Sequence, residues 1–564
     1  MTPVSPPARD LPAPRTAPSP VGRLREILQP DRGDLLAVLA YAVFIGALNL
    51  STPIAVQALV NSIALGGLLQ PLVVVTLLLL VALAFAAVLV AVQAWVVELL
   101  QRRVFLRTFS RIAARLPRVD AVAFDQGHGP ELVNRIFDVV TVQKAAAKLL
   151  TDTLAMTLSV AAGLVVLAFY HPLLLAFDAL LVVAIAALVL GPRRRGERTA
   201  IEESDAKYAM AAWLEDVAQS PLTFKAGGAH RWLVGRADEL AERWVRSRRA
   251  HFATYYRQVL GALGLMVVTN TALLGVGGLL VIRGSLTLGQ LVAAELIVGA
   301  VVVSVAKLGK HLETWYDLMA AVKKVGVLLD IPVESTGQEQ PDGPAGAGAL
   351  EARGLTARGD GGRVLLDGVD LALAPGEVLA ITGASGSGKS VLLEVLWGLR
   401  TPDSGSLLVN DRPIADLSTD ALRSQVGLVA DPEIVHGPLL DNVTLRREGV
   451  THDDARAALR AAGLDGLVRT LPGGLESGLG PWDRRLSDLE IRRVVLARAL
   501  AGAPGVLLLD DLVDRLPPEE RVERVRALSA WSGGTSVVVV SDDPAVHGIA
   551  DTVLHLPTRS PDGN

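Results

Sequence analysis

Three long apolar blocks dominate the first half of the chain. They run from Leu35 to Val97 without a charged residue, from Thr153 to Pro192, and from Gln258 to about Lys307. Because about 20 apolar residues are enough to cross a bilayer, each block can hold two spans joined by a short turn. The pattern therefore predicts six membrane spans in three hairpins. Their turns are expected at Gly66–Pro71, Phe169–Pro172 and Arg283–Gln290.

The segments between the blocks are rich in arginine. The segment from Glu98 to Lys148 contains seven arginines, and the segment from Arg193 to Arg257 is equally basic, whereas Arg283 is the one cationic residue at the predicted hairpin tips. Cationic residues near span ends stay on the cytoplasmic side. We therefore expect both long loops and both termini to be cytoplasmic. These loops are longer than connections need to be, so the spans are expected to continue as helices beyond the membrane.

The second half of the chain has a different pattern. Short apolar runs such as VLAIT and VLLLD alternate with helical patterns, which indicates an α/β domain with a largely parallel sheet. We expect a disordered Pro-rich tail over residues 1–20, which lacks the apolar core of a signal peptide, and a Gly/Pro-rich linker. The predicted divisions are a tail (1–20), a six-span domain (21–330), a linker (331–348) and a soluble domain (349–560).

Composition narrows the class of protein. Hydrophobic residues make up 51% of the chain and charged residues 20%, which agrees with a membrane-embedded half. The formal net charge of −4 gives no electrostatic reason to expect a nucleic-acid partner. Cysteine is absent, and this excludes disulfides, thiolate metal sites and a cysteine nucleophile.

The segment GASGSGKS, Gly383 to Ser390, matches the phosphate-binding pattern GxxxxGK[ST]. It lies between a predicted strand and a predicted helix, which is the context that the motif requires. Its backbone N–H groups are expected to surround phosphates, Lys389 to add a positive charge, and the Ser390 hydroxyl to ligate Mg²⁺. Asp510, at the end of LLLDD, is the second expected magnesium ligand. The predicted nucleotide-binding residues are Gly383, Ala384, Ser385, Gly386, Ser387, Gly388, Lys389 and Ser390.

The segment RRLSDLEIRRVVLARALAGAPGVLLLDD, Arg484 to Asp511, makes the pattern more specific. Together with the phosphate loop it resembles the ATPase domain of ABC transporters, and the six spans resemble the exporter-type transmembrane domain of that family. The resemblance covers nearly the whole chain. It implies a half-transporter that uses ATP and Mg²⁺, and a dimer in which each nucleotide site combines one chain's phosphate loop with the other chain's signature.

Several positions depart from the family pattern. The signature LSGGQ is replaced by LSDLE, Leu486 to Glu490, in which Ser487 and Glu490 can still form a capping box. Asp488 places a negative charge at the helix end that would meet phosphate. In addition, Ala430 and Asp431 stand where the family has a glutamine, and Asp542 stands where it has a histidine. No aromatic residue lies between Glu351 and Asp370 to stack on adenine, for which the Arg358 guanidinium is one alternative.

Asp511 occupies the position of the family's glutamate base, but its side chain is about one methylene shorter. A displacement of about 1 Å can cost roughly 10²-fold in rate. With Asp542 also degenerate, we expect ATP to bind and its hydrolysis by this chain to be weak or absent. The leading hypothesis is a subunit of an ATP-driven exporter that pairs with a second, competent half-transporter. LSDLE would also weaken the partner's site. Two alternatives stay open: a homodimeric export ATPase with altered motifs, and a membrane scaffold or nucleotide sensor that transports nothing.

The remaining chemical groups are less specific. Asp178 and Glu295 lie within predicted spans, where ionisable groups are expensive; they either line a pathway or face a seam between helices. His128 and His171 lie in turn-like segments without a second metal ligand. Segments Asp138–Lys148 and Tyr208–Ala218 resemble the family's coupling helices. The resemblance implies a multi-pass protein of a bacterial inner membrane, with the bilayer and an exported substrate as partners. The sequence does not identify that substrate.

Overall fold

The computed structural model describes most of the chain. The described residues are 18–64, 69–120, 134–225, 227, 229–334, 337–339, 346–359, 362–481, 483 and 485–557, with the side chains of 302, 306 and 308 left out. Most of the predicted tail, His128, parts of the first hairpin turn and parts of the linker lie outside them. The chain divides into two compact units, one made chiefly of residues up to Pro332 and the other made chiefly of residues from Val333 onward, with Asp120–Val122 grouped with the second.

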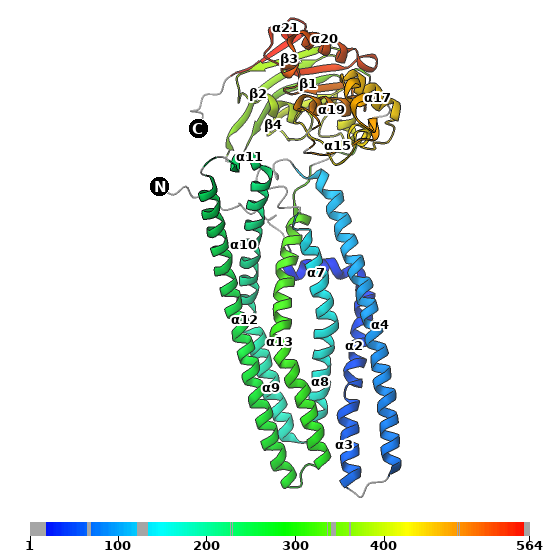
Figure 1. Ribbon diagram of the computed structural model, residues 1–564, viewed down its shortest axis with the longest axis vertical. Helices are drawn as coiled ribbons and strands as arrows, with labels where there is room; N and C mark the ends of the chain where they lie inside the picture. The colour runs from blue at the N-terminus through cyan, green and yellow to red at the C-terminus, as the bar shows by residue number, and fades with distance from the viewer. Residues whose placement is uncertain are drawn as a thin grey trace. The chain divides into compact units, whose positions relative to one another are not determined.

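The first unit is helical. Its principal helices are α1 (Pro20–Leu28), α2 (Arg32–Leu48), α3 (Ser51–Ala64), α4 (Leu69–Arg115), α7 (Phe137–Lys148), α8 (Leu154–Ala168), α9 (Pro172–Leu190), α10 (Arg193–Gln219), α11 (Pro221–Phe224), α12 (Ala229–Ile282) and α13 (Leu288–Asp330). A π-helical turn, Leu149–Thr153, joins α7 to α8. Helices α10, α12 and α13 run side by side, as do α2 and α4 (Figure 1).

The prediction of six spans is confirmed. Among the described residues, six helical segments are long and apolar enough to cross a membrane. They are Pro20–Ala64, Leu69–Arg118, Phe137–Ala168, Pro172–Gln219, Ala229–Ile282 and Leu288–Asp330. At 1.5 Å per residue, the 47 residues of α4 and the 54 residues of α12 extend about 70 and 80 Å, far beyond a hydrocarbon core of roughly 30 Å. The spans therefore continue as helices past the bilayer, as the long basic segments predicted.

The predicted turns lie between helices where the structure describes them. His171 caps α9, because its Nδ1 accepts a hydrogen bond from the backbone N–H of Leu173 at 3.1 Å. His171 therefore lies in the turn before α9, as the sequence predicted. Asp178 is buried in α9, and neither carboxylate oxygen has a hydrogen-bond partner among the described residues. Glu295 lies on the exposed surface of α13.

The two segments predicted to be coupling helices both lie in helices of the first unit. Residues 138–148 belong to α7, and residues 208–218 form the C-terminal part of α10. The Tyr208 hydroxyl donates to Asp138 Oδ2 at 2.6 Å, and both residues are buried. That these segments act as coupling helices stays a prediction. The short helix between α10 and α12 is α11, on which Leu222 is 84% exposed.

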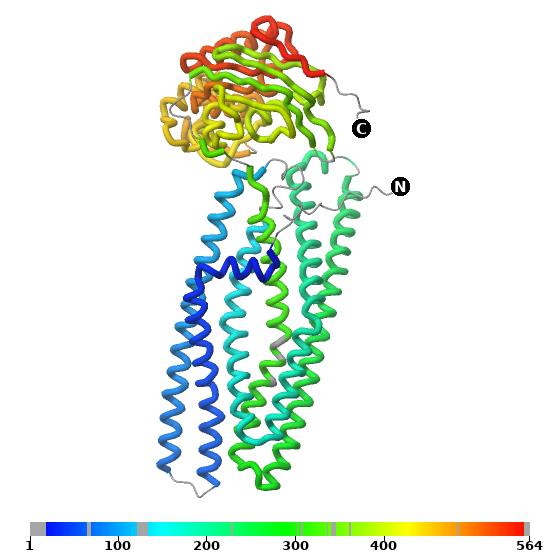
Figure 2. Tube along the Cα trace, turned by 180° about the vertical axis from the view of Figure 1, so that it is seen from behind, coloured from blue at the N-terminus to red at the C-terminus, as the bar shows by residue number. Residues whose placement is uncertain are grey.

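Helix α1 lies across the long helices of the first unit instead of along them (Figure 2). Its Ser19 side chain caps the N-terminus by accepting from the Gly22 N–H. The buried Arg23 forms an ion pair with Asp330 at the end of α13. This pair fixes the first helix of the chain against the last helix of the unit.

The second unit is an α/β domain with two main sheets. An antiparallel sheet has the order β2 (Val364–Leu373), β1 (Leu350–Arg358), β4 (Ser404–Val409), β5 (Arg412–Pro413). A parallel sheet has the order β11 (Thr552–Leu556), β3 (Val378–Gly383), β10 (Ser536–Val540), β9 (Val506–Leu509), β6 (Val426–Val429). Strands β7 (Gly437–Pro438) and β8 (Gly478–Leu479) form a small third sheet.

The helices of this unit complete the fold. They are α14 (Lys389–Leu396), α15 (Thr419–Gln425), α16 (Leu439–Thr444), α17 (His452–Ala461), α18 (Asp465–Thr470), α19 (Asp488–Leu500), α20 (Pro518–Ser529) and α21 (Pro544–His547). Strands β9 and β10 are buried along their whole length, as expected for parallel strands covered on both faces. The predicted parallel sheet is therefore confirmed, whereas the antiparallel sheet was not predicted.

Candidate nucleotide site

The phosphate loop connects β3 to α14. Gly388, at the N-cap of α14, has φ +103°, a conformation that glycine adopts without steric cost. Ser387 is buried, and its hydroxyl has no hydrogen-bond partner among the described residues. The Lys389 ammonium donates to the backbone carbonyl groups of Gly383 and Ala384. The unpartnered hydroxyl and the adjacent ammonium fit the binding of an anion such as phosphate.

Asp510 lies directly after β9 and accepts a hydrogen bond from Ser390. Burial raises the pKa of this carboxyl, while the Ser390 hydrogen bond lowers it. Asp511 and Asp431 raise the pKa further through their negative charges. This gathering of acids beside Ser390 is the electrostatic environment that a divalent cation would neutralise. Both predicted magnesium ligands therefore lie together, and the donor set fits Mg²⁺ held with the help of phosphate oxygens.

Asp542 lies two residues after β10 and contacts the start of the phosphate loop. Its Oδ1 accepts from the Thr382 hydroxyl at 2.7 Å and from the Gly383 N–H at 3.4 Å. The Thr382 hydrogen bond holds the pKa of Asp542 below its usual value, so the group is ionised at neutral pH. Asp514 fixes the loop that carries it, accepting from the Asp542 N–H at 3.1 Å. A second negative charge therefore faces the loop that would bind phosphate.

Asp511 is tied to two arginines. Arg515 donates to Asp511 Oδ2 from Nε at 2.8 Å and from Nη2 at 2.6 Å. Arg492 Nη2 lies 3.9 Å from the same oxygen. The backbone of Asp511 has φ +56°, in the left-handed region that aspartate tolerates better than most residues. The carboxylate that is predicted to stand at the position of the catalytic base is therefore already paired with cations of its own chain.

The same arginines reach the signature segment. Asp488 Oδ2 lies 3.2 Å from Arg492 Nε and 3.6 Å from Arg515 Nη1. Arg492 is buried, and its Nη1 also donates to the Ala430 carbonyl at 3.2 Å. We call Asp488, Arg492, Asp511 and Arg515 the arginine clasp. It joins the start of α19 to the end of β9 and to the loop after β6.

The predicted capping box is confirmed. Ser487 Oγ accepts from the Glu490 N–H at 3.2 Å, and the Glu490 carboxylate accepts from the Ser487 N–H at 2.8 Å. Helix α19 therefore begins at Asp488 despite the altered signature. The side chain of Asp488 is 57% exposed at this helix end.

The sheet register explains why distant residues meet. Strand β10 pairs with β3 on one side and with β9 on the other, all three being parallel. Gly383, Asp510 and Asp542 therefore follow the carboxyl ends of three adjacent strands. This edge is where ligands bind in open α/β sheets. Arg358, in contrast, ends β1 of the other sheet, and its side chain is exposed.

Sequence reasoning missed the two arginines of the clasp. Their signal was the four-residue spacing of Asp488 to Arg492 and of Asp511 to Arg515, at which opposite charges can pair on a helix or tight turn. Sequence reasoning also missed Thr382 and Asp514. Nothing in their local pattern distinguishes them from other residues of a strand end or a loop.

Comparison with known proteins decides the family. A family model described as ABC transporter matches residues 366–513, which contain the phosphate loop, the signature and Asp510. The chain is 24% identical over 517 residues to the alpha-hemolysin translocation ATP-binding protein HlyB of Escherichia coli O157:H7, covering 90% of this chain and 72% of the relative. The chain is an ABC transporter.

Two further similarities agree with this assignment. The transporter is 29% identical over 474 residues to the mycobactin import ATP-binding/permease protein IrtB of Mycolicibacterium thermoresistibile, covering 80% of this chain and 78% of the relative. Its fold matches the structure of a bacterial Atm1-family ABC exporter with ATP bound, with a TM-score of 0.79, 21% identity and 93% coverage of both chains.

These findings establish the general architecture of the transporter. It is a multi-pass membrane protein that fuses one transmembrane domain to one ATP-binding domain, and it is therefore a half-transporter. ABC exporters work as dimers in the membrane, and their ATPase domains use nucleotide and Mg²⁺.

Proposed function

We propose that this chain is the nucleotide-binding, weakly hydrolysing subunit of a heterodimeric ABC exporter. Residues 349–560 act as its nucleotide-binding domain. The phosphate loop from Gly383 to Ser390 binds the phosphates of ATP, and Ser390 with Asp510 holds Mg²⁺. Nucleotide-driven closure changes the access of the six spans. The chain lies in a bacterial inner membrane with both termini in the cytoplasm.

The observation that carries this proposal is the pairing of Asp511 with Arg515. A general base must be free to accept a proton from the attacking water within hydrogen-bond reach. The Oδ2 atom of Asp511 instead accepts two charge-assisted hydrogen bonds from Arg515. A carboxylate held in this way is a weaker base, and its position is set by the arginine.

Two further features support weak hydrolysis. The ionised Asp542 lies against Gly383 and opposes the approach of a γ-phosphate through like-charge repulsion. Asp488 is the first residue of α19, and its negative charge offsets the positive N-terminal end of this helix. That helix end would otherwise attract the phosphate of the partner chain's nucleotide. Binding is retained because the phosphate loop and the magnesium ligands are complete.

The partner is a second half-transporter with an intact signature and a glutamate base. The altered signature of this chain would also weaken the partner's site, so both sites of the pair depart from the family pattern. Export is the proposed direction, on the strength of the exporter fold. One relative is named for import, and a reconstituted pair in vesicles would decide the direction.

The decisive experiment is steady-state phosphate release by the purified full chain in lipid, alone and with its partner. We expect the chain alone to be indistinguishable from its Lys389→Ala variant, and the pair to turn over. Robust turnover by the chain alone would support the homodimeric ATPase instead. Nucleotide binding without transport by any reconstituted pair would support the nucleotide sensor.

A further inference from the structure

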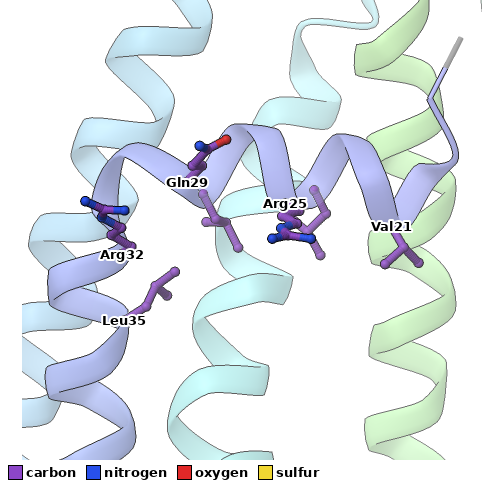
Figure 3. A pocket seen from close by; sticks show the side chains of 7 residues that line it. Val21, Arg25, Gln29, Arg32 and Leu35 are labelled. Atoms are coloured by element: carbon purple, nitrogen blue, oxygen red, sulfur yellow. The ribbon is translucent and has the colours of Figure 1, made fainter.

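The corner between α1 and α2 encloses a groove of about 560 Å³ (Figure 3). Its floor is aliphatic and includes Val21, Leu28 and Leu35. Arg25 and Arg32 line the same groove, one from each arm of the corner. An apolar floor with two cations at its edge is a surface suited to an amphipathic anion.

The groove lies at the depth where the helices change from apolar to charged. On α2 the uncharged stretch begins at Leu35, and on α4 it ends at Val97. Arg107 of α4 donates to the Ile27 carbonyl of α1 at 2.8 Å. Arg107 lies ten residues beyond Val97, which is about 15 Å along a helix. Helix α1 therefore crosses the bundle on the charged side of the apolar stretch, and Leu35 lies where that stretch begins on α2.

The arginines around this corner fall into two groups. Arg23 pairs with Asp330, Arg103 with Asp34 at 2.6 Å, and Arg107 with Asp31 at 2.7 Å. Arg25 and Arg32 are exposed and have no acidic partner among the described residues. The protein neutralises the cations that fix α1 in place and leaves unpaired the two that line the groove.

We propose that this groove binds an acidic phospholipid of the adjoining leaflet. The headgroup phosphate lies between Arg25 and Arg32, and the acyl chains lie along Leu28 and Leu35. A neutral, zwitterionic lipid would present its own cation to the same arginines and bind less well. The site goes beyond the proposed function, because it requires neither nucleotide nor a particular partner chain.

The absence of cysteine from the chain makes a direct test possible. Val21→Cys, at a position that is 45% exposed in the groove, is labelled with a fluorophore in the full-length protein. The protein is reconstituted into phosphatidylcholine vesicles containing increasing fractions of brominated phosphatidylglycerol or brominated phosphatidylcholine. We expect brominated phosphatidylglycerol to quench the fluorophore at a clearly lower fraction. Arg25→Gln with Arg32→Gln should remove this preference. Each arginine is expected to contribute about fivefold to the relative affinity for the acidic lipid.

Two controls separate the groove from general attraction to an anionic surface. Leu36 follows Leu35 on α2 and is 65% exposed. The labelled Leu36→Cys variant should show no preference between the two lipids. Arg243→Gln with Arg246→Gln makes the same change in charge at exposed positions on α12 and should leave the preference at Val21→Cys intact. Glutamine has nearly the helix propensity of arginine, so α1 is retained. Equal quenching by both lipids at Val21→Cys, or a preference that survives loss of both arginines, would overturn the proposal.

Discussion

Arg515 and Asp511 form a charge-assisted pair in which two guanidinium nitrogens, at 2.6 and 2.8 Å, share one carboxylate oxygen. Arg515 also lies 3.6 Å from Asp488 at the start of α19. One arginine therefore links the position of the catalytic base to the position of the signature.

We expect the full chain to bind MgATP, and Lys389→Ala to weaken that binding by about 10- to 100-fold. The expected loss corresponds to one hydrogen bond to a charged group, roughly 1.5–3 kcal/mol. Titration calorimetry of the detergent-purified protein measures it. Lys225→Ala removes an exposed lysine outside the site and should bind like the wild type. Equal affinities for the two variants would contradict the assigned role of Lys389.

Asp511→Glu alone is expected not to restore hydrolysis. Arg515 and Arg492 can pair with a glutamate as they do with Asp511, and Asp542 and Asp488 remain. The left-handed backbone at this position also costs an ordinary residue about 1–2 kcal/mol. Catalytic groups that act as a unit are strongly non-additive.

Restoration should require Asp511→Glu, Asp542→His, Asp488→Gly and Leu489→Gly together with Arg515→Ala, which frees the new carboxylate. We expect the combination to raise phosphate release by about 10²-fold or more, the usual contribution of a general base. Each protein is measured against its own Lys389→Ala version. Full activity of Asp511→Glu by itself would show that the short side chain of Asp511 is the one defect and that the arginine clasp does not limit hydrolysis.

Asp510→Asn is expected to stabilise the nucleotide-free protein at neutral pH while it abolishes magnesium-dependent nucleotide binding. Burial raises the pKa of Asp510 above its unfolded value. The stability that the protonated group contributes is therefore present below the unfolded pKa and is lost as pH rises through the folded pKa. At neutral pH the ionised carboxylate is a cost, which asparagine removes.

The expected gain is about 0.5–2 kcal/mol, typical of substitutions that relieve a functional site. Thermal unfolding at neutral and acidic pH measures it, and the gain should shrink as the pH falls toward the unfolded pKa. Asp416→Asn, at an exposed position, is the matched control and should change little. A destabilised Asp510→Asn protein would mean that the carboxylate is needed for folding.

The hairpin tip between α12 and α13 is expected to face the outside of the cell. Cysteine at Ser285, exposed in that turn, should be labelled in intact cells by a membrane-impermeant reagent. Arg198 lies on α10 with its side chain 77% exposed. A cysteine at this position should be labelled only after the cells are lysed. The native chain has no cysteine and gives no background. The opposite labelling pattern would place the basic segments outside.

In the membrane half of the chain, the local pattern of apolar residues is enough to predict the spans. The uncharged run from Leu35 to Val97 determines two helical spans because a helix satisfies its backbone hydrogen bonds within itself in a bilayer. The contact between α7 and α10 could not be read in the same way. Asp138 and Tyr208 pair only because α7 and α10 are brought together, and neither residue has a local signal for that contact.

By itself, the sequence determined the phosphate loop, the capping box at Ser487 and the strand that ends in Asp510. Each is a local motif in which neighbouring residues supply the hydrogen bonds and backbone conformation. The tertiary structure alone decided that Asp542 lies on Gly383 and that Arg492 reaches Asp511 and Ala430. Those contacts join residues far apart in the chain. They depend on the order of parallel strands β3, β10 and β9, and strand order is fixed by packing throughout the sheet, which no local pattern encodes.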